Sequence, residues 1–410
     1  MVAAGPALRR CFGAAADRLA EEHWNARPLL VRAAERAAEG GRASVHDLLS
    51  PVDVDELLGP RALRTPFFSL VQNGTPLPRS GYTRRAVAGN QQLADLPDSE
   101  RIAAAHAAGA TIVLQALHRT WPPLQTFCSQ LAEDLGHQCQ VNVYITPPGA
   151  QGFKPHHDTH DVVVLQVDGR KHWTIHPPVV ELPSKSQPST RLGPDPVGGR
   201  APVIDTVLEP GDALYLPRGW LHSARTTEDR SIHLTVGLLA TTWADVLGDA
   251  VASAGAEDVA LRRALPLPGA LSPEEVKEFR AAAQRWLDTL DDDAVHRLAA
   301  RRQAGAVPPE PVPVLAQDEA VRTLTAQRPL RPRRGTRARL TGGGETVDVV
   351  LPDRRITFPG WLRPALEHVL AAERTSASEL AAVGLDPDDA LVVLRRLLRE
   401  SVLLPAGEQV

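Results

Sequence analysis

The sequence predicts an α+β protein in which a small antiparallel β-barrel lies between helical regions. Six short apolar runs, bounded by glycine, proline and aspartate, fall between residues 139 and 239. No helical pattern separates them, and short strands at such spacing are typical of a barrel or sandwich. Helical periodicity dominates before and after this region. The combination favours a double-stranded β-helix, a barrel of the jelly-roll or cupin kind.

The length of 410 residues predicts two to four domains. Four prolines between positions 308 and 313 indicate a linker. The predicted organisation is an N-terminal helical cover over 1–136, a barrel core over 137–240, a helical region over 241–306, the linker over 307–314 and a winged-helix-like domain over 315–410.

The composition excludes several classes of protein. Apolar residues make up 43% and charged residues 23%, which is ordinary for a globular chain. The net charge of −4 implies no general attraction to nucleic acid or to an anionic membrane. The three cysteines have no CxxC spacing, which argues against a disulfide scaffold or a cysteine zinc site. No apolar run approaches the ~18 residues of a membrane span, and no signal peptide is evident. We therefore expect a cytoplasmic protein with no membrane partner.

The elements of the cover and barrel follow from their periodicity. Leucines and a phenylalanine at helical spacing between residues 124 and 135 predict a helix of the cover. An Asp-Gly pair at 168–169, between two apolar runs, predicts a type I′ hairpin. The predicted strands are 140–146, 161–167, 171–176, 202–208, 212–217 and 231–239.

Two helical regions follow the barrel. Ser272 and the glutamates after it predict the start of a helix over 272–290. Exposed apolar stripes usually mark association surfaces, so the stripe on this helix predicts a homodimer. Helices over 361–372, 376–383 and 387–400, followed by a short strand, are typical of a winged helix. The stripe consists of Val276, Phe279, Ala283, Trp286 and Leu290.

Seven of the fourteen histidines fall between positions 156 and 233, inside the predicted barrel. His156 and Asp158 are separated by one residue, so in an extended segment their side chains leave the same face. His222 follows another predicted strand. Two histidines and a carboxylate form the facial triad of non-haem Fe(II) oxygenases. The spacing alone leaves His157 and His160 open as alternatives, although His157 would point to the opposite face from Asp158.

A longer resemblance gives these residues a context. Between about residue 105 and 239 the chain resembles the Jumonji-C, cupin-like ribosomal oxygenases, which are protein histidyl or arginyl hydroxylases that use Fe(II) and 2-oxoglutarate. This chain has His157 between the two ligands, where the family often has an aromatic residue. The motifs are GATIVLQALHR (109–119), QVNVYITPPGAQGFKPHHDTHDVVVLQVDGRKHWTIHPP (140–178), GDALYLPRGWLHSA (211–224) and SIHLTVGL (231–238).

The resemblance implies a role for each matched position. It places Fe(II) on His156, Asp158 and His222, which would also be the catalytic centre. It places the carboxylate of the 2-oxoglutarate cosubstrate on Lys171, with Asn142 and Thr235 beside it, and it implies O₂ as the oxidant. Tyr144 falls where the family contacts its substrate. The helical region after the barrel and the winged-helix-like domain also match the family's arrangement.

The leading hypothesis is therefore a 2-oxoglutarate-dependent dioxygenase that hydroxylates a histidine or arginine of a protein, with a ribosomal protein as the expected substrate. One alternative is a tailoring hydroxylase of a peptide or small molecule. Another is a DNA-binding regulator in which the barrel senses a ligand, because 328–339 holds six arginines that could contact phosphates. The helix over 387–400 begins with aspartates, which opposes specific DNA binding. The run of arginines is more typical of a solvated flexible stretch.

Overall fold

The computed structural model describes residues 4–265, 267 and 271–407. The chain divides into two compact units, Met1–Ala306 and Val307–Val410, and each is described by itself. No helix among the described residues is long and apolar enough to cross a membrane.

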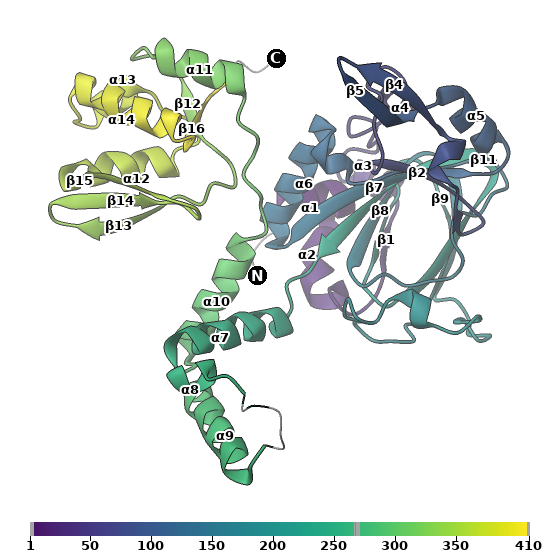
Figure 1. Ribbon diagram of the computed structural model, residues 1–410. Coiled ribbons are helices and arrows are strands. Elements are labelled where there is room, and N and C mark those ends of the chain that lie inside the picture. The colour runs from purple at the N-terminus through teal and green to yellow at the C-terminus, as the bar shows by residue number, and fades with distance from the viewer. Residues whose placement is uncertain (1–3, 266, 268–270, 408–410) are drawn as a thin grey trace. The chain divides into compact units, whose positions relative to one another are not determined.

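A curved nine-stranded sheet forms the centre of the first unit (Figure 1). Its strand order is β1-β10-β8-β11-β7-β6-β2-β3, with β9 beside β8, and every pairing is antiparallel. The predicted antiparallel core is thus confirmed. The strands are β1 (Leu29–Val31), β2 (Phe68–Gln72), β3 (Thr75–Pro76), β6 (Thr111–Leu114), β7 (Gln138–Thr146), β8 (Asp161–His176), β9 (Ile204–Leu208), β10 (Ala213–Leu216) and β11 (Leu221–Leu239).

The N-terminal region contains more than the helical cover that the sequence predicts for 1–136. It also supplies four strands of the central sheet: β1, β2, β3 and β6. All four residues of β6 are buried, so the strand shows no alternation of apolar and polar positions. A short continuous apolar run of this kind is not distinguished from a buried helical segment by periodicity. The barrel therefore extends beyond the predicted limits of 137–240.

The hairpin predicted at Asp168-Gly169 is wrong. β8 continues through both residues, and the strand on each side of them pairs with β11. Lys171 pairs with Thr226 whereas Gly169 pairs with Ser231, so β11 contains extra residues here and bulges. Gly169 has φ of +61°, a conformation that glycine adopts readily. The Asp-Gly pair accommodates a bulge and not a reversal of the chain.

Helices cover one face of the sheet and leave the other face to line the interior. In β8, Val163 and Leu165 pack into the same apolar core as Phe127 of α6, while Val162 and Val164 face the other way. The sequence correctly predicts α6 as a helix. The helices of this part are α1 (Pro6–Phe12), α2 (Ala16–Arg18), α3 (Ala33–Ala38), α4 (Pro51–Leu58), α5 (Ser99–Ala107) and α6 (Pro122–Leu135), and β4 (Thr83–Ala88) and β5 (Gln91–Pro97) form a separate hairpin.

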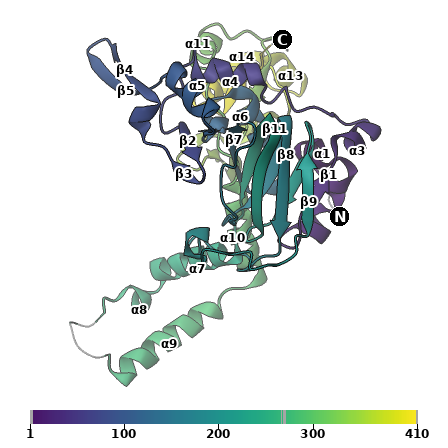
Figure 2. The same ribbon diagram turned by 90° about the vertical axis from the view of Figure 1, so that its right-hand side faces the viewer.

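Four helices follow the barrel: α7 (Trp243–Glu257), α8 (Val259–Arg262), α9 (Pro273–Leu287) and α10 (Asp292–Ala304). Ser272 caps α9 as predicted, in a capping box with Glu275. Figure 2 shows α8 and α9 extending away from the barrel. The predicted apolar stripe is exposed in its first half, since Val276 is 41% and Phe279 is 64% exposed. Ala283 and Trp286 are half-buried, and Leu290 lies beyond the end of α9.

The second unit contains the three predicted helices and the predicted terminal strand. It also contains a three-stranded sheet that the sequence analysis did not predict, β13-β14-β15, which precedes the first of these helices. A further pair, β12-β16, joins the start of the unit to its end. The elements are α11 (Val314–Arg322), β12 (Leu330–Pro332), β13 (Arg339–Gly343), β14 (Thr346–Val350), β15 (Arg355–Pro359), α12 (Arg363–Ala371), α13 (Ala377–Ala382), α14 (Pro387–Arg399) and β16 (Leu403–Pro405).

The arginines of 328–339 are largely engaged within this unit. Arg331 binds the carboxylate of Glu310 through two hydrogen bonds of 2.6 and 2.7 Å. Arg333 donates to the backbone carbonyl of Glu310, and Arg337 donates to that of Val307. These bonds hold the proline-rich segment against the unit. The solvated, flexible stretch expected from the sequence is therefore not what these arginines form.

The bulge at Gly169 can be tested by the effect of a substitution on the stability of the fold. At Gly169 a Cβ would collide with the carbonyl oxygen of Arg230, whereas at Gly149, with φ of +66°, it would meet nothing within 4 Å. Gly149→Ala should lower the free energy of unfolding by about 1–2 kcal/mol, because alanine adopts the left-handed backbone conformation at a cost. Gly169→Ala should lower the midpoint of thermal unfolding clearly further. Equal midpoints for the two variants would contradict the bulge.

Candidate metal centre and adjoining cavity

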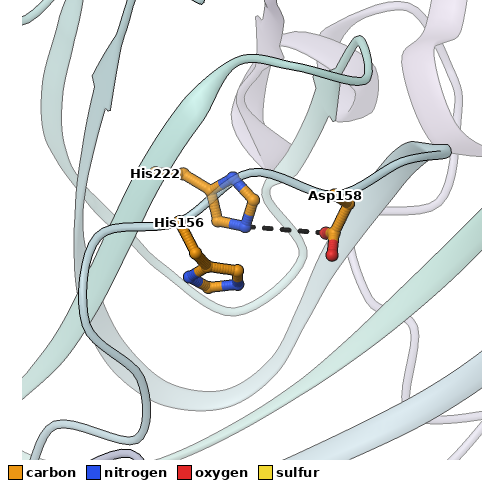
Figure 3. A group of neighbouring side chains, drawn as sticks. All are labelled: His156, Asp158 and His222. Carbon is orange, nitrogen blue, oxygen red and sulfur yellow. Dashed lines mark ion pairs between the residues drawn. The ribbon is translucent and has the colours of Figure 1, made fainter. Parts of the chain in front are cut away.

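Three potential metal ligands, predicted from the sequence, lie together at one end of the barrel. The ligand atoms of His156, Asp158 and His222 all fall within 4.8 Å of one another (Figure 3). His156 and Asp158 lie between β7 and β8, and His222 lies near the start of β11. The backbones of the two histidines pair directly, with N–H···O distances of 3.1 and 2.8 Å. This pairing brings together two segments that are far apart in the sequence.

Backbone carbonyls orient both imidazole rings. Nδ1 of His156 lies 2.8 Å from the carbonyl oxygen of Lys154, and Nδ1 of His222 lies 3.0 Å from that of Trp220. A carbonyl oxygen can only accept, so each Nδ1 carries a proton, and in the neutral ring Nε2 is then the atom with the free lone pair. Burial, together with neighbouring His156, lowers the pKa of His222 to about 4. The His222 ring is therefore neutral near pH 7, as metal binding requires.

This donor set fits a divalent transition metal. Nε2 of His222 lies 3.6 Å from a carboxylate oxygen of Asp158, and the ring centroids of the two histidines are 4.3 Å apart. Two imidazoles and one carboxylate, all on one side, are the ligand set of non-haem Fe(II) oxygenases. The Nδ1–H bonds to backbone are the usual outer support of metal-binding histidines. The remaining side of the centre faces a cavity.

The cavity has a volume of about 250 Å³ and contains all three candidate ligands in its wall. Lys171, Tyr144 and Thr235, which the sequence analysis proposed as site residues, also line it. The other lining residues are Thr111, Gly152, Phe153, Val162, Val164, Trp173, Leu216, Ala224 and His233. The structure thus brings together six of the seven predicted site residues.

Lys171 is a cation buried in the cavity wall. It is 3% exposed, and its ammonium donates to Oγ1 of Thr146 at 3.0 Å. Within the described ranges of the chain it forms no ion pair. Burial lowers the pKa of Lys171 to about 7. A buried ammonium without a counter-charge is costly, so this position favours an anionic group in the cavity.

Aromatic rings form another wall of the cavity. Tyr144 stacks on His233 with ring centroids 5.1 Å apart and meets Phe153 edge-on at 5.9 Å. Trp173 approaches His233 edge-on at 5.4 Å. Burial and the nearby Asp158 raise the pKa of Tyr144, so its hydroxyl stays protonated. The rings give the cavity a rigid apolar side next to the candidate metal ligands.

Asn142 differs from the other predicted site residues. It pairs with Thr235 across β7 and β11, but it is not among the residues that line the cavity. Its side-chain oxygen accepts the backbone N–H of Ala116 at 2.9 Å, where Ala116 has φ of +50°. Asn142 therefore stabilises the turn after β6, and its contact with a cosubstrate remains a prediction.

The two alternative histidines lie outside the cavity. His157 is buried, and its Nε2 lies 3.0 Å from the carbonyl oxygen of Gln187. Its backbone N–H donates to Oγ of Ser189 at 3.0 Å, and the Ser189 hydroxyl donates back to the carbonyl of His157. His157 thus anchors the loop between β8 and β9, in agreement with its predicted orientation away from Asp158. His160 packs near Gly237 and is not part of the ligand group.

The sequence analysis missed His233 as a site residue. It counted this histidine in the cluster but assigned it no role. His233 lies two positions before Thr235 on β11, so the two side chains leave the same face of the strand. That alternation was the signal that could have identified it. Burial and nearby Lys171 hold the pKa of His233 well below its ordinary value, so the ring is neutral.

Comparisons with known proteins agree on this region. Residues 118–246 match the JmjC domain. Human ribosomal oxygenase 1 is 34% identical over 255 residues, which are 59% of this chain and 36% of that protein. The Drosophila persimilis bifunctional lysine-specific demethylase and histidyl-hydroxylase NO66 is 34% identical over 233 residues, 52% of this chain and 33% of that protein. The chain spans only about a third of the length of these relatives.

A solved structure shares the fold across both units. The Escherichia coli ribosomal oxygenase YcfD aligns with 95% of this chain and 97% of its own, with a TM-score of 0.54 and 18% identity. The same protein in complex with cobalt and 2-oxoglutarate gives a TM-score of 0.53 at 19% identity, covering 95% of this chain and 98% of that one. These structures confirm the fold, and the JmjC match with the two relatives confirms the resemblance inferred from the sequence motifs.

The ligand assignment predicts that His156→Ala and His222→Ala each abolish stoichiometric metal binding. Loss of one of three ligands should weaken affinity by more than the roughly 10–100-fold that follows loss of a supporting hydrogen bond. His172→Ala is the matched control, because this histidine lies on β8, bonds to Asp205 at 2.8 Å and is outside the ligand group. Titration with Co(II), followed by visible absorption, measures the binding. One full equivalent bound by both ligand variants would contradict the assignment.

The buried lysine predicts a pH-dependent stability. The pKa of Lys171 is about 7 in the fold and 10.5 when unperturbed, so the unfolded chain binds its proton more tightly. The resulting penalty, on the order of a few kcal/mol, is complete below pH 7 and fades as pH rises toward 10.5. Lys171→Met should therefore raise the melting temperature most near pH 6–7 and progressively less toward pH 10. Lys277→Met, at an exposed lysine, should show no such trend. If Lys171→Met raised the melting temperature by the same amount at every pH, burial of the charged lysine would not be the cause of the change.

Proposed function

We propose, from the JmjC domain that residues 118–246 form, that this protein is an Fe(II)- and 2-oxoglutarate-dependent oxygenase that hydroxylates a side chain of a protein. One observation carries the proposal. The two-histidine, one-carboxylate group lines the same cavity as a buried lysine that has no ion-pair partner among the residues described. A bound metal ion would explain why the three ligands lie together. A dicarboxylate cosubstrate would explain why a lysine is buried beside them.

Each group of cavity residues would have a separate role in the reaction. When bound, Fe(II) with 2-oxoglutarate and O₂ supplies the oxidising power to hydroxylate an unactivated C–H bond. His156, Asp158 and His222 would hold the metal and leave its cavity side open. Lys171 would bind the distal carboxylate of the cosubstrate, with Thr235 in the same wall. The rigid ring of Tyr144 would orient the substrate, and the apolar surroundings would exclude water from the reacting groups.

A protein substrate is the best-supported class. The relatives in the comparisons are named ribosomal oxygenases or histidyl-hydroxylases, which supports a ribosomal protein as target and a histidine as the modified residue. Arginine, the other expected target, is supported by the resemblance of the sequence motifs alone. A peptide or small-molecule tailoring hydroxylase uses the same centre and differs only in its substrate. The regulator hypothesis is less well supported, because Arg331 and Arg333 are bound to the chain's own segment at Glu310. We also propose a cytoplasmic location.

The experiment measures substrate-dependent conversion of 2-oxoglutarate to succinate, with intact-mass analysis of isolated ribosomal proteins. One ribosomal protein should gain about 16 Da, one oxygen atom, only with enzyme, Fe(II) and 2-oxoglutarate present. Lys171→Ala should raise the required 2-oxoglutarate about 10–100-fold, since a hydrogen bond to a charged group is worth about 1.5–3 kcal/mol. Lys171→Arg should do less damage because it keeps the charge.

Lys277→Ala, at an exposed lysine, is the matched control and should leave the requirement for 2-oxoglutarate unchanged. An unaltered requirement in Lys171→Ala would overturn the cosubstrate assignment. Turnover with peptides or small molecules, and none with any ribosomal protein, would replace the substrate class and keep the chemistry.

We further propose that helices α7–α10 form a homodimer interface and that the second unit is a winged-helix domain without specific DNA binding. Exposed apolar side chains recur along these helices, among them Trp243, Leu247 and Phe279, at 76%, 51% and 64% exposure. Exposed apolar side chains of this size, where they gather on one surface, are typical of association sites. Phe279→Glu should convert a dimer to a monomer in sedimentation at micromolar concentration. A monomeric wild-type protein would contradict the proposal.

A further inference from the structure

The second unit contains a groove that the proposed oxygenase chemistry does not use. It lies between α14 and the end of β15 with the turn that follows, Gly360–Leu362, and has a volume of about 540 Å³. Both walls belong to the same unit, in which α14 is the last helix (Figure 1). The lining residues are Thr357, Phe358, Pro359, Trp361, Leu362, Asp389, Val392, Val393, Arg395, Arg396 and Arg399.

Apolar side chains form the floor and part of both walls. Phe358 and Val393 are buried in the core of the unit and close the groove from below. Trp361 on one wall is 59% exposed, and Val392 on the other is 62% exposed. A large apolar residue on each side of a hollow, left open to solvent, is typical of a surface that receives an apolar side chain. Tryptophan and arginine are also the residues most enriched at binding hot spots.

Three arginines of α14 give the groove a positive edge. Arg395 and Arg399 are four residues apart, so they lie on the same face of the helix. Neither takes part in an ion pair within the described part of the chain, whereas Arg396 bonds to Glu400 at 3.0 Å. Asp389 is the single acidic residue in the lining. The groove therefore combines an apolar floor with two arginines that are free to bind carboxylates.

We propose that this groove binds an acidic peptide segment of another protein, with one large apolar side chain beside Trp361 and its carboxylates on Arg395 and Arg399. Arginine binds carboxylates through paired hydrogen bonds, which gives the contact both strength and direction. The groove differs from the proposed catalytic site in the charge that it selects. Proteins that bind nucleic acid are basic, so a basic ribosomal substrate would be repelled here.

The observations favour a peptide over nucleic acid. Single-stranded nucleic acid is bound by a positively charged groove that follows its backbone and by several aromatic rings on which successive bases stack, whereas Trp361 is the one exposed aromatic ring in this lining. The other end of α14 is acidic, since Asp386 caps the helix and Asp388 and Asp389 follow in its first turn. Those carboxylates would oppose a strand that continued along the helix. A short peptide with one apolar side chain and neighbouring carboxylates could contact Trp361 on one wall and Arg395 and Arg399 on the other.

The test uses the full chain and fluorescence anisotropy of labelled probes. The probes are short glutamate-rich peptides with one leucine or tryptophan, the same peptides with glutamine for glutamate, and single-stranded oligouridine. The acidic peptides should bind, and the glutamine versions should bind at least about tenfold more weakly, a loss of about 1.4 kcal/mol. Added salt should weaken the acidic complexes.

Substitutions locate the binding. Arg395→Glu with Arg399→Glu, and separately Trp361→Ala, should each weaken the acidic peptides at least about tenfold. Arg322→Glu is the matched control, because this arginine is exposed on α11, pairs with Asp318 and lies outside the groove. If Trp361→Ala unfolds, Arg395→Gln with Arg399→Gln removes the charges without reversing them and tests the same contact.

Three results would overturn the proposal. The first is that no acidic peptide binds the wild-type chain. The second is that the acidic peptides bind the groove variants as tightly as the wild type. The third is that oligouridine binds and loses affinity in the arginine variants while the acidic peptides do not, which would assign the groove to single-stranded nucleic acid.

Discussion

The backbone pairing of His156 with His222 is the constraint on which the rest of the candidate site depends. Two hydrogen bonds, of 3.1 and 2.8 Å, fix the segment after β7 against the start of β11. Without them, ligands from two remote parts of the chain would share no common frame. The imidazoles then need only their Nδ1 bonds to local carbonyls to present Nε2 toward Asp158. The barrel supplies the rigidity, since β11 is also paired along its length with β7 and β8.

The fold could be predicted from the sequence where polar and apolar residues alternate or recur at a clear period. The helix α6, the cap at Ser272 and most strands of the barrel were predicted in this way. Other features could not be predicted, and two of them show why. β6 is buried at every position and therefore has no alternation to detect. Gly169 has the positive φ of a hairpin turn, but that dihedral angle serves a bulge equally well, and only the pairing with Ser231 distinguishes the two.

The residues of the candidate site also differ in whether local sequence spacing could identify them. The spacing of His156 and Asp158 indicates a shared face, because neighbouring positions on an extended strand alternate between faces. Lys171 has no such pattern around it, and only the family resemblance identified it before the structure showed a buried ammonium. His233 shares a strand face with Thr235, and that alternation could have indicated it. Its burial, however, depends on Tyr144 of β7 and Trp173 of β8, which pack against its ring, and these contacts cannot be read from local spacing.

His157 connects the loop after β8 to the segment that carries the candidate metal ligands His156 and Asp158. This residue stands between two candidate ligands, and it holds the loop after β8 through Gln187 and Ser189. The bond to Gln187 uses a backbone carbonyl, so many side chains are acceptable there. The bond to Ser189 uses a hydroxyl that both accepts and donates, which the hydroxyl of serine or threonine can do. A substitution elsewhere in the loop would leave these two bonds intact, so the placement of the candidate ligands on either side of His157 depends on one hydroxyl of the loop.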